Sequence, residues 1–219
     1  MRRVIVVVLT ASTMFVASTP TNSQVSSAGT NWLLDVIPLT SPAASNSAQP
    51  QLSALGDRVV LSWVERSGDS ATLRFSERTD SGWTEARTVA TGSNWFVNWA
   101  DVPSVIPLQH ESMAAHWLQK SAASTYAYDV RLGFSRDRGR TWSASVTPHH
   151  DGTRTEHGFA SLFPMPGQGL GVVWLDGRQM KEGAHEGMDG GNMSLRGALF
   201  GPDGNQASEM AIDDRVCEC

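Results

Sequence analysis

The densest group of side chains able to do acid–base chemistry lies in the segment HHDGTRTEH, residues 149–157. Imidazole and carboxylate groups can exchange protons near neutral pH, which general acid–base catalysis requires. We expect Glu156 to be a catalytic residue, with His157 and Arg154 binding substrate. A solvated polar loop is the simpler alternative. The segment could also ligate a metal, but its spacing fits no standard zinc motif, so we expect no metal and no other cofactor.

A second candidate pair follows the apolar run VVWLD, where Asp176 is the last residue and Arg178 comes two residues later. Asp176 is a candidate catalytic carboxylate. Arg178 could hold a substrate carboxylate through its planar fork. The loop continues to Asn192 with five Gly. Ordinary turn chemistry for Asp-Gly is the alternative interpretation.

A third candidate loop, TGSNWFVNWAD, contains Trp99 and ends at Asp101. An exposed Trp ring can cover the C–H face of a sugar while a carboxylate binds its hydroxyls. We therefore expect Trp99 to bind substrate and Asp101 to be catalytic. Alternatively, both Trp of this loop pack between structural elements.

The elements that must position these loops repeat along the chain. Trp63, Trp117 and Trp174 lie in the runs LSWVE, AHWLQ and VVWLD, 54 and then 57 residues apart, and each run has a short strand pattern before and after it. Four short antiparallel strands per repeat are typical of a propeller blade. The sequence predicts an all-β fold, a partial β-propeller with blades at about 50–97, 98–155 and 156–212 and a fourth beginning at 213–219. A β-sandwich is the alternative.

This blade arrangement sorts the loops by the end of the strands at which they emerge. In a propeller, the connections into a new blade and those between the second and third strands share one end. The turns between the third and fourth strands lie at the other. The three candidate loops belong to the first group, so we expect Asp101, Glu156, His157, Asp176 and Arg178 to share one end.

The segment SRDRGRTW, residues 135–142, forms a turn of the second group. We expect the Ser and Asp oxygens to accept backbone N–H groups, Gly139 to adopt a positive φ, and the Trp to bury its ring beneath the turn. The residues at its marked positions are Ser135, Asp137, Gly139, Thr141 and Trp142. This pattern resembles the Asp box, or BNR repeat, of the sialidase (neuraminidase) superfamily.

The resemblance implies that residues 50–219 are similar to the N-terminal half of a six-bladed sialidase ring, with exo-α-sialidase activity on glycans. The family uses an Asp acid/base, a Tyr nucleophile assisted by Glu, and three Arg on the substrate carboxylate. This chain lacks the family's early Arg-Ile-Pro segment. Two function classes remain: a glycoside hydrolase with Asp101, Glu156, Asp176 and Arg178 in its site, or a non-catalytic propeller that binds glycans or proteins. Three blades leave open side faces, so we do not expect the chain as given to be a stable monomer. Either it is a truncated half of a ring or two copies associate to make one, and truncation is the simpler explanation.

The N-terminus and the composition indicate where the protein works. A basic start, Met1-Arg2-Arg3, and an apolar run predict a signal peptide over residues 1–28, hence a secreted, periplasmic or cell-surface protein with no stable membrane span. An uncleaved anchor is the alternative. Residues 29–49 are expected to be a linker with a ring-closing strand. A net charge of −5 makes nucleic acid an improbable partner. Cys217 and Cys219 form a Cys-x-Cys pair without two further ligands nearby, so we expect their partners beyond the chain's last residue.

Overall fold

A computed structural model describes residues 37–181 and 191–216. The chain divides into two units, residues 1–38 and 39–219, and the second contains every element named below. The predicted signal peptide, most of the predicted strand at residues 32–39, the outer part of the loop after Asp176, and both cysteines lie outside the described residues. Among the residues described, no helix is long and apolar enough to cross a membrane.

Three antiparallel sheets make up the described part of the second unit, and each contains one of the predicted repeats. We call them blades 1, 2 and 3. Blade 1 consists of β1 (Ser47–Leu55), β2 (Arg58–Ser67), β3 (Ser70–Thr79), β4 (Gly82–Trp83) and β5 (Arg87–Gly92). Blade 2 consists of β6 (Ser104–Pro107), β7 (Met113–Lys120) and β8 (Tyr128–Ser135). Blade 3 consists of β9 (His157–Pro164), β10 (Leu170–Asp176), β11 (Met193–Phe200) and β12 (Gln206–Val216), with a short 3-10 helix η1 (Pro166–Gln168) after β9.

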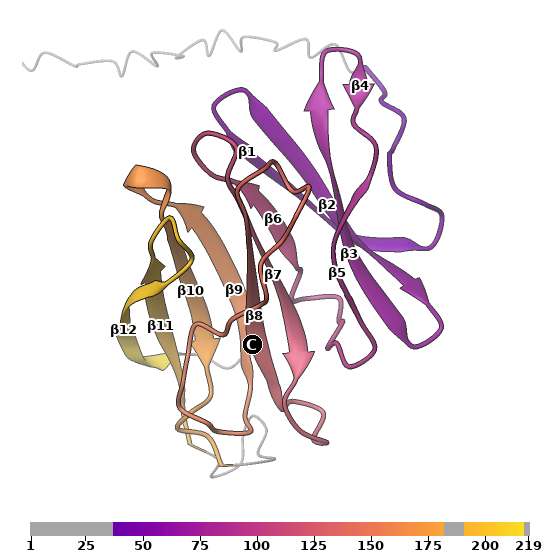
Figure 1. Ribbon diagram of the computed structural model, residues 1–219. Coiled ribbons are helices and arrows are strands. Elements are labelled where there is room, and N and C mark those ends of the chain that lie inside the picture. The colour runs from indigo at the N-terminus through magenta and orange to yellow at the C-terminus, as the bar shows by residue number, and fades with distance from the viewer. Residues whose placement is uncertain (1–36, 182–190, 217–219) are drawn as a thin grey trace, which may run out of the picture. The chain divides into compact units, whose positions relative to one another are not determined.

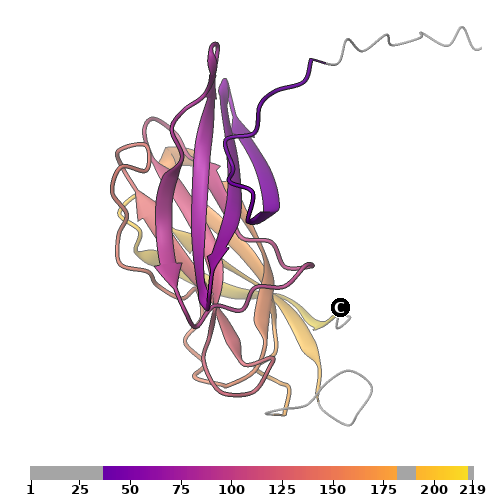
Figure 2. The ribbon, with the colours of Figure 1, turned by 90° about the vertical axis from the view of Figure 1, so that its right-hand side faces the viewer.

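The three blades lie next to one another in chain order, as Figure 1 shows, and Figure 2 gives a second view of the same arrangement. The first strands of the three blades are neighbours, since β1 contacts β6 and β6 contacts β9. Within each blade the strands then pair outward in chain order, ending at β12 in blade 3. Sequential antiparallel strands radiating from an inner strand are the architecture of propeller blades. The predicted all-β, partial propeller fold is confirmed.

The outer strands differ most from the prediction. In blade 2 the segment after the box turn forms no named strand. It is joined to β8 by a bridge between Leu132 and Val146 and by the Ser143 N–H, which donates to the Phe134 carbonyl. The Arg131 guanidinium donates to the Ser145 carbonyl, which would otherwise be available to a strand partner. In blade 3, β12 continues through Val216, whereas the sequence placed residues 213–216 in a connection to a fourth blade. Blade 1 begins at Ser47, inside the predicted linker.

Two apolar clusters hold the blades together. Blades 1 and 2 share one cluster, to which Leu73, Phe75 and Met113 contribute. Blades 2 and 3 share the other, which includes Leu118 and Trp174. The residues that alternate with these in each strand face the neighbouring cluster or solvent, as the two-residue period of a strand requires. The clusters fix the spacing of the blades and therefore of the loops at their ends.

Candidate functional site

The strand registers place the candidate loops and the box turn at opposite ends of the blades. In blade 2, Lys120 pairs with Tyr128 at one end and Met113 pairs with Ser135 at the other. A bridge between Tyr128 and Glu156 joins blades 2 and 3 at the first end, which we call the site end. His157 pairs with Asp176 at this same end. The five candidate side chains therefore emerge together, as the repeat register predicts.

At the other end, the box turn has the hydrogen bonds that its residue types predict. Ser135 Oγ accepts the Gly139 N–H at 2.8 Å, and Asp137 Oδ1 accepts the Thr141 N–H at 2.9 Å. The Thr141 hydroxyl donates to Asp137 Oδ2 at 2.6 Å. Gly139 has a φ of +74°, and a Cβ there would stand 2.3 Å from Phe75 of blade 1. The turn thus packs directly on the neighbouring blade.

Three side chains form a compact acidic group at the site end: Asp101, Tyr128 and Glu156. The Tyr128 hydroxyl donates to Glu156 Oε1 at 2.5 Å. Asp101 Oδ2 and the Tyr128 oxygen both lie within 3.1 Å of the point where a Cβ on Gly158 would stand. Only glycine leaves this space, so the small residue after His157 allows the carboxylate and the phenol to approach the same stretch of backbone. We call these three residues the channel group.

A bulge in β9 aims a backbone donor at this group. The pairing of β9 with β10 shifts between Val173 and Leu175, and opposite the shift Phe159 has a φ of +49°, unusual for a residue with a side chain. Its N–H donates to Asp101 Oδ2 at 2.5 Å. Strained backbone of this kind occurs preferentially where a function requires it.

Burial sets the protonation of the channel group. It raises the pKa of Asp101 to about 6; the Phe159 N–H opposes this rise and the negative charge of Glu156 adds to it. Burial and the same charge also raise the pKa of Tyr128. Tyr128 therefore stays protonated and acts as a hydrogen-bond donor rather than a nucleophile. Asp101 is a carboxyl that can hold or release a proton close to neutral pH.

Asp101 also borders a cavity of about 300 Å³ along the inner strands. Its walls include Gln51 and Ser53 of β1, Ser104 of β6 and Ser161 of β9. Small polar side chains of this type can bind a hydroxylated ligand by hydrogen bonds. The channel group and this cavity together form the candidate active site.

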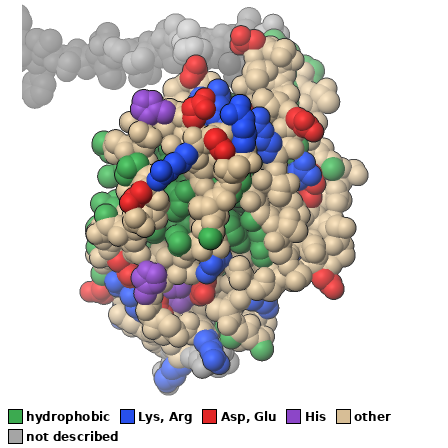
Figure 3. All heavy atoms as spheres, in the orientation of Figure 1, with side chains coloured by type: hydrophobic (Ala, Val, Ile, Leu, Met, Phe, Trp, Pro, Cys, Tyr) green, Lys and Arg blue, Asp and Glu red, His purple; other side chains and the backbone are tan. Residues whose placement is uncertain are grey.

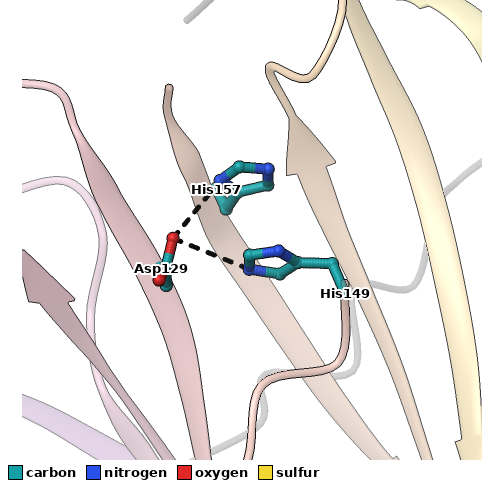
Figure 4. A group of neighbouring side chains, drawn as sticks. All are labelled: Asp129, His149 and His157. Carbon is teal, nitrogen blue, oxygen red and sulfur yellow. Dashed lines mark ion pairs between the residues drawn. The ribbon is translucent and has the colours of Figure 1, made fainter. Parts of the chain in front are cut away.

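His157 points away from the channel group into a second cluster at the same end. Its ring is fully buried and stacks on the buried His149 ring, with centroids 3.8 Å apart and planes at 7°. Asp129 and Asp151 lie at opposite edges of the stacked rings, and Figure 4 shows the two His and Asp129. Burial alone lowers the pKa of His157, but the carboxylates of Asp151, Asp176 and Asp129 outweigh it, and the pKa is raised. We call Asp129, His149, Asp151 and His157 the His–Asp cluster.

Asp176 and Arg178 are occupied with each other. The Arg178 Nε donates to Asp176 Oδ1 at 2.7 Å, and its Nη2 donates to Glu209 Oε1 at 2.7 Å. The Asp176 side chain is completely buried and also accepts the Trp174 indole N–H. Arg178, predicted to bind a substrate carboxylate, is therefore already paired with two acids of its own blade. Asp176, predicted to be catalytic, has no contact with solvent.

The remaining predicted binding residues are exposed. Trp99 is 92% exposed, whereas Trp95 of the same loop stacks on Trp117 with centroids 5.5 Å apart. The alternative of packed Trp therefore holds for one ring and not the other. Arg154 is exposed at the site end. These two exposed side chains lie outside both the channel group and the His–Asp cluster.

Sequence reasoning missed Tyr128 and Asp129 as members of the two groups. Both begin β8, where an alternating pattern gives no sign of function. The sequence did contain a signal for a structural role of Asp176. The residue two positions after the repeated Trp is Glu65 in blade 1, Gln119 in blade 2 and Asp176 in blade 3. Glu65 accepts the Trp63 indole N–H as Asp176 accepts that of Trp174. An acid that accepts the indole N–H is thus shared by blades 1 and 3, whereas blade 2 has Gln119 at this position.

Comparison with solved structures supports the fold. An α-L-arabinofuranosidase from Fusarium graminearum matches with a TM-score of 0.51 and 17% identity, over 75% of this chain and 50% of that one. A polysaccharide lyase matches with a TM-score of 0.48 and 9% identity, over 75% of this chain and 40% of that one. The catalytic domain of an α-L-arabinofuranosidase from Coprinopsis cinerea matches with a TM-score of 0.45 and 12% identity, over 77% of this chain and 56% of that one.

The first of these matches carries the argument, and at its identity it shows the fold alone. The chain spans about half the length of that structure. No protein-family model matches the sequence, and no curated protein does. None of the three structures is described as a sialidase, so the sialidase resemblance stays a prediction.

Proposed function

We propose that the protein is a carbohydrate-active propeller, a glycoside hydrolase whose acid–base pair is Asp101 and Glu156. The observation that carries this proposal is a carboxyl with a pKa of about 6 beside a second carboxylate at the edge of a polar cavity. Glycosidases of most families use two carboxyl groups held in different protonation states. Here Asp101 is the general acid. Glu156, oriented by the Tyr128 hydroxyl, is the base or nucleophile.

Two observations support a carbohydrate as the substrate. The matched Fusarium enzyme is an α-L-arabinofuranosidase, and the chain aligns with half of it. The cavity wall includes three Ser hydroxyls and one Gln amide among apolar side chains, and these polar groups suit a hydroxylated ligand. The chain covers only half of that enzyme, so an arabinofuranosidase activity is one candidate among those of neutral glycosidases.

A neutral sugar fits better than sialic acid. Sialidase chemistry needs arginines for the substrate carboxylate, and the candidate clamp Arg178 already binds Asp176 and Glu209. The Tyr128–Glu156 pair is similar in composition to the Tyr and Glu of the sialidase mechanism. However, the raised pKa of Tyr128 opposes its ionisation. We therefore expect neutral glycosides to be cleaved in preference to sialosides.

A binding module that performs no catalysis is the second candidate, and the 92% exposure of Trp99 favours it. An aromatic ring exposed to this extent can stack on a sugar outside the cavity. In that case Trp99→Ala would weaken glycan affinity while Asp101→Asn would leave it unchanged.

The test measures hydrolysis of aryl glycosides, beginning with an α-L-arabinofuranoside and a sialoside. If the proposal holds, Asp101→Asn and Glu156→Gln each lower kcat/KM by about a hundredfold or more. Asp203→Asn, in an exposed turn at the opposite end, is the matched control and should keep full activity. Hydrolysis that survives both site substitutions would overturn the assignment of the acid–base pair. Saturable glycan binding without hydrolysis would favour the binding module.

A further inference from the structure

Two buried imidazoles present one nitrogen each to the same carboxylate. His157 Nδ1 lies 3.6 Å from Asp129 Oδ1, and His149 Nε2 lies 4.0 Å from the same oxygen. Figure 4 shows both rings facing Asp129. The three ligand atoms all lie within 4.8 Å of one another. They come from β8, from the segment before β9, and from the first residue of β9.

Neither nitrogen has a hydrogen-bond partner among the described residues, although both side chains are almost wholly buried. The His149 side chain is 5% exposed and that of His157 is 0% exposed. A buried polar atom without a partner costs about 1–3 kcal/mol, so such atoms are rare in folded proteins. The two nitrogens would both have a partner if a further group were bound between the two rings and Asp129.

The opposite edges of the rings show how the two nitrogens become electron-pair donors. Asp151 Oδ2 lies 3.1 Å from His149 Nδ1 and 3.3 Å from His157 Nε2. A carboxylate behind an imidazole is the usual support of a metal-binding His. His149 Nδ1 is hydrogen-bonded to this carboxylate, which favours the proton there and leaves a lone pair on the Nε2 that faces Asp129. His157 Nε2 lies near the same carboxylate but has no hydrogen-bond partner, so for this ring Asp151 acts through its charge alone. Asp151 is itself held by the Thr153 N–H.

The surrounding charges also call for a cation. Four carboxylates, of Asp129, Asp151, Asp176 and Glu209, connect through ion pairs to the guanidiniums of Arg178 and Arg196. Without an ion, the raised pKa of His157 lets its imidazolium offset one of these charges. When an ion displaces that proton and both imidazoles are neutral, the group carries two net negative charges. One divalent cation would balance them.

We propose that Asp129, His149 and His157 bind a divalent transition-metal ion, with zinc the best fit. Zinc takes His nitrogen and Asp oxygen at about 2.0–2.2 Å, so the donor atoms of a tetrahedral site lie about 3.4 Å apart. The present distances from Asp129 Oδ1 are 3.6 Å and 4.0 Å, so the side chains would have to move slightly toward the ion. Two imidazoles disfavour calcium and magnesium, which prefer all-oxygen sites. Three protein ligands leave a fourth position, and the Asp129 side chain is 24% exposed, so solvent reaches the site. The ion would link blade 2 to blade 3.

The spacing of these ligands explains why no zinc motif predicts the site. Asp129 is separated from His149 by the box turn, and Asp151, the supporting carboxylate, lies between the two His in sequence. The pairing of blades 2 and 3 brings them together. The proposal is independent of the acid–base pair, because the channel group is not among the ligands.

The experiment titrates the metal-stripped full chain, without a His tag, with Zn²⁺ by calorimetry and records thermal unfolding. Cys217→Ser and Cys219→Ser form the background because a Cys-x-Cys pair can bind zinc itself. We expect one saturable Zn²⁺ site and a higher unfolding midpoint with Zn²⁺. Asp129→Asn and His149→Gln should each lower the affinity at least about tenfold and reduce the shift in midpoint. Titration with Ca²⁺ should give neither saturable binding nor a higher unfolding midpoint.

His150→Gln is the matched control, since His150 is adjacent to His149 in sequence but exposed. It should bind Zn²⁺ like the background protein. Asp129→Asn also serves where a His variant fails to fold, because it is nearly isosteric. The proposal is overturned if the background protein shows no saturable Zn²⁺ binding, or if Asp129→Asn and His150→Gln bind with equal affinity. Binding of Ca²⁺ in place of Zn²⁺ would also overturn it.

Discussion

Asp101 is a carboxyl that the folded chain keeps in a costly environment. It is 2% exposed and accepts one backbone N–H from Phe159, which offsets part of the loss of water. The charge of Glu156 nearby adds to the cost of ionisation. A folded-state pKa of about 6, above the unfolded value of about 3.9, means that the folded protein binds this proton more tightly.

This difference predicts a pH-dependent stability. As the pH rises from about 4 to about 6, the unfolded chain has already released the proton that folded Asp101 retains, so stability falls. Asp101→Asn removes the ionisation and keeps an acceptor for Phe159. The variant should be more stable than the unsubstituted protein above about pH 6, by at most about 3 kcal/mol, and the difference should vanish near pH 4. Urea unfolding at both pH values measures it.

A stability difference that is constant across this range would contradict the raised pKa. Asp203→Asn is the control, because Asp203 is exposed and its pKa is lowered by the Asn205 N–H. Its effect should not grow as the pH rises above 6. If Asp101→Asn gains stability and loses activity, the Asp101 carboxyl serves catalysis at the expense of stability.

At the scale of elements, one arrangement recurs in every blade. The repeated Trp on the second strand pairs across to an Arg on the third: Trp63 with Arg74, Trp117 with Arg131, and Trp174 with Arg196. Each Arg then reaches the outer segment of its own blade, at the Ala86 carbonyl, the Ser145 carbonyl or the Glu209 carboxylate. This repeated pair couples the inner half of each blade to its outer half.

The box turn couples one blade to the next, which makes it testable. Trp142 meets Phe75 of blade 1 edge-on, with ring centroids 6.1 Å apart. Trp142→Ala should therefore destabilise the fold by about 3 kcal/mol. Asp137→Ala removes the acceptor for the Thr141 N–H and hydroxyl and should also lower the unfolding midpoint. Differential scanning calorimetry provides the measurement.

Arg140→Ala is the matched control within the same turn, since Arg140 is exposed. This variant should have the same unfolding midpoint as the unsubstituted protein. Unchanged midpoints for both Trp142→Ala and Asp137→Ala would show that the turn does not contribute to stability as its contacts indicate.

At the scale of the described unit, apolar side chains remain uncovered on the first and third blades. Leu52 of β1 is 62% exposed and Phe163 of β9 is 38% exposed, while Ile212 of β12 is 51% exposed. Figure 3 shows apolar side chains gathered over the middle of one face, between charged side chains above and below. Uncovered apolar area of this kind favours association.

We therefore expect the chain to form dimers or larger species. Size-exclusion chromatography with light scattering should show a mass that rises with concentration in the micromolar range. Leu52→Ser removes exposed apolar area without touching the core and should shift the equilibrium toward monomer. A monomer at all concentrations, for both proteins, would contradict this expectation.

The repeat in the sequence predicted most of the fold because blade strands are local elements. Trp63, Trp117 and Trp174 mark the second strand of each blade, and turn residues separate the strands. The fourth strand of blade 2 was predicted and is absent as a named strand. In its place, Arg131 and the Ser145 carbonyl are hydrogen-bonded, a contact that no pattern of periodicity records.

The sequence by itself determined which loops share an end, since strand alternation fixes the direction of every connection. The tertiary structure decided which side chains meet there. Glu156 and His157 are adjacent in sequence, yet Glu156 joins Tyr128 in the channel group while His157 stacks on His149 between the blades. The physical reason is that successive side chains of a strand point to opposite faces. What lies on each face depends on packing between blades, which a single sequence does not record.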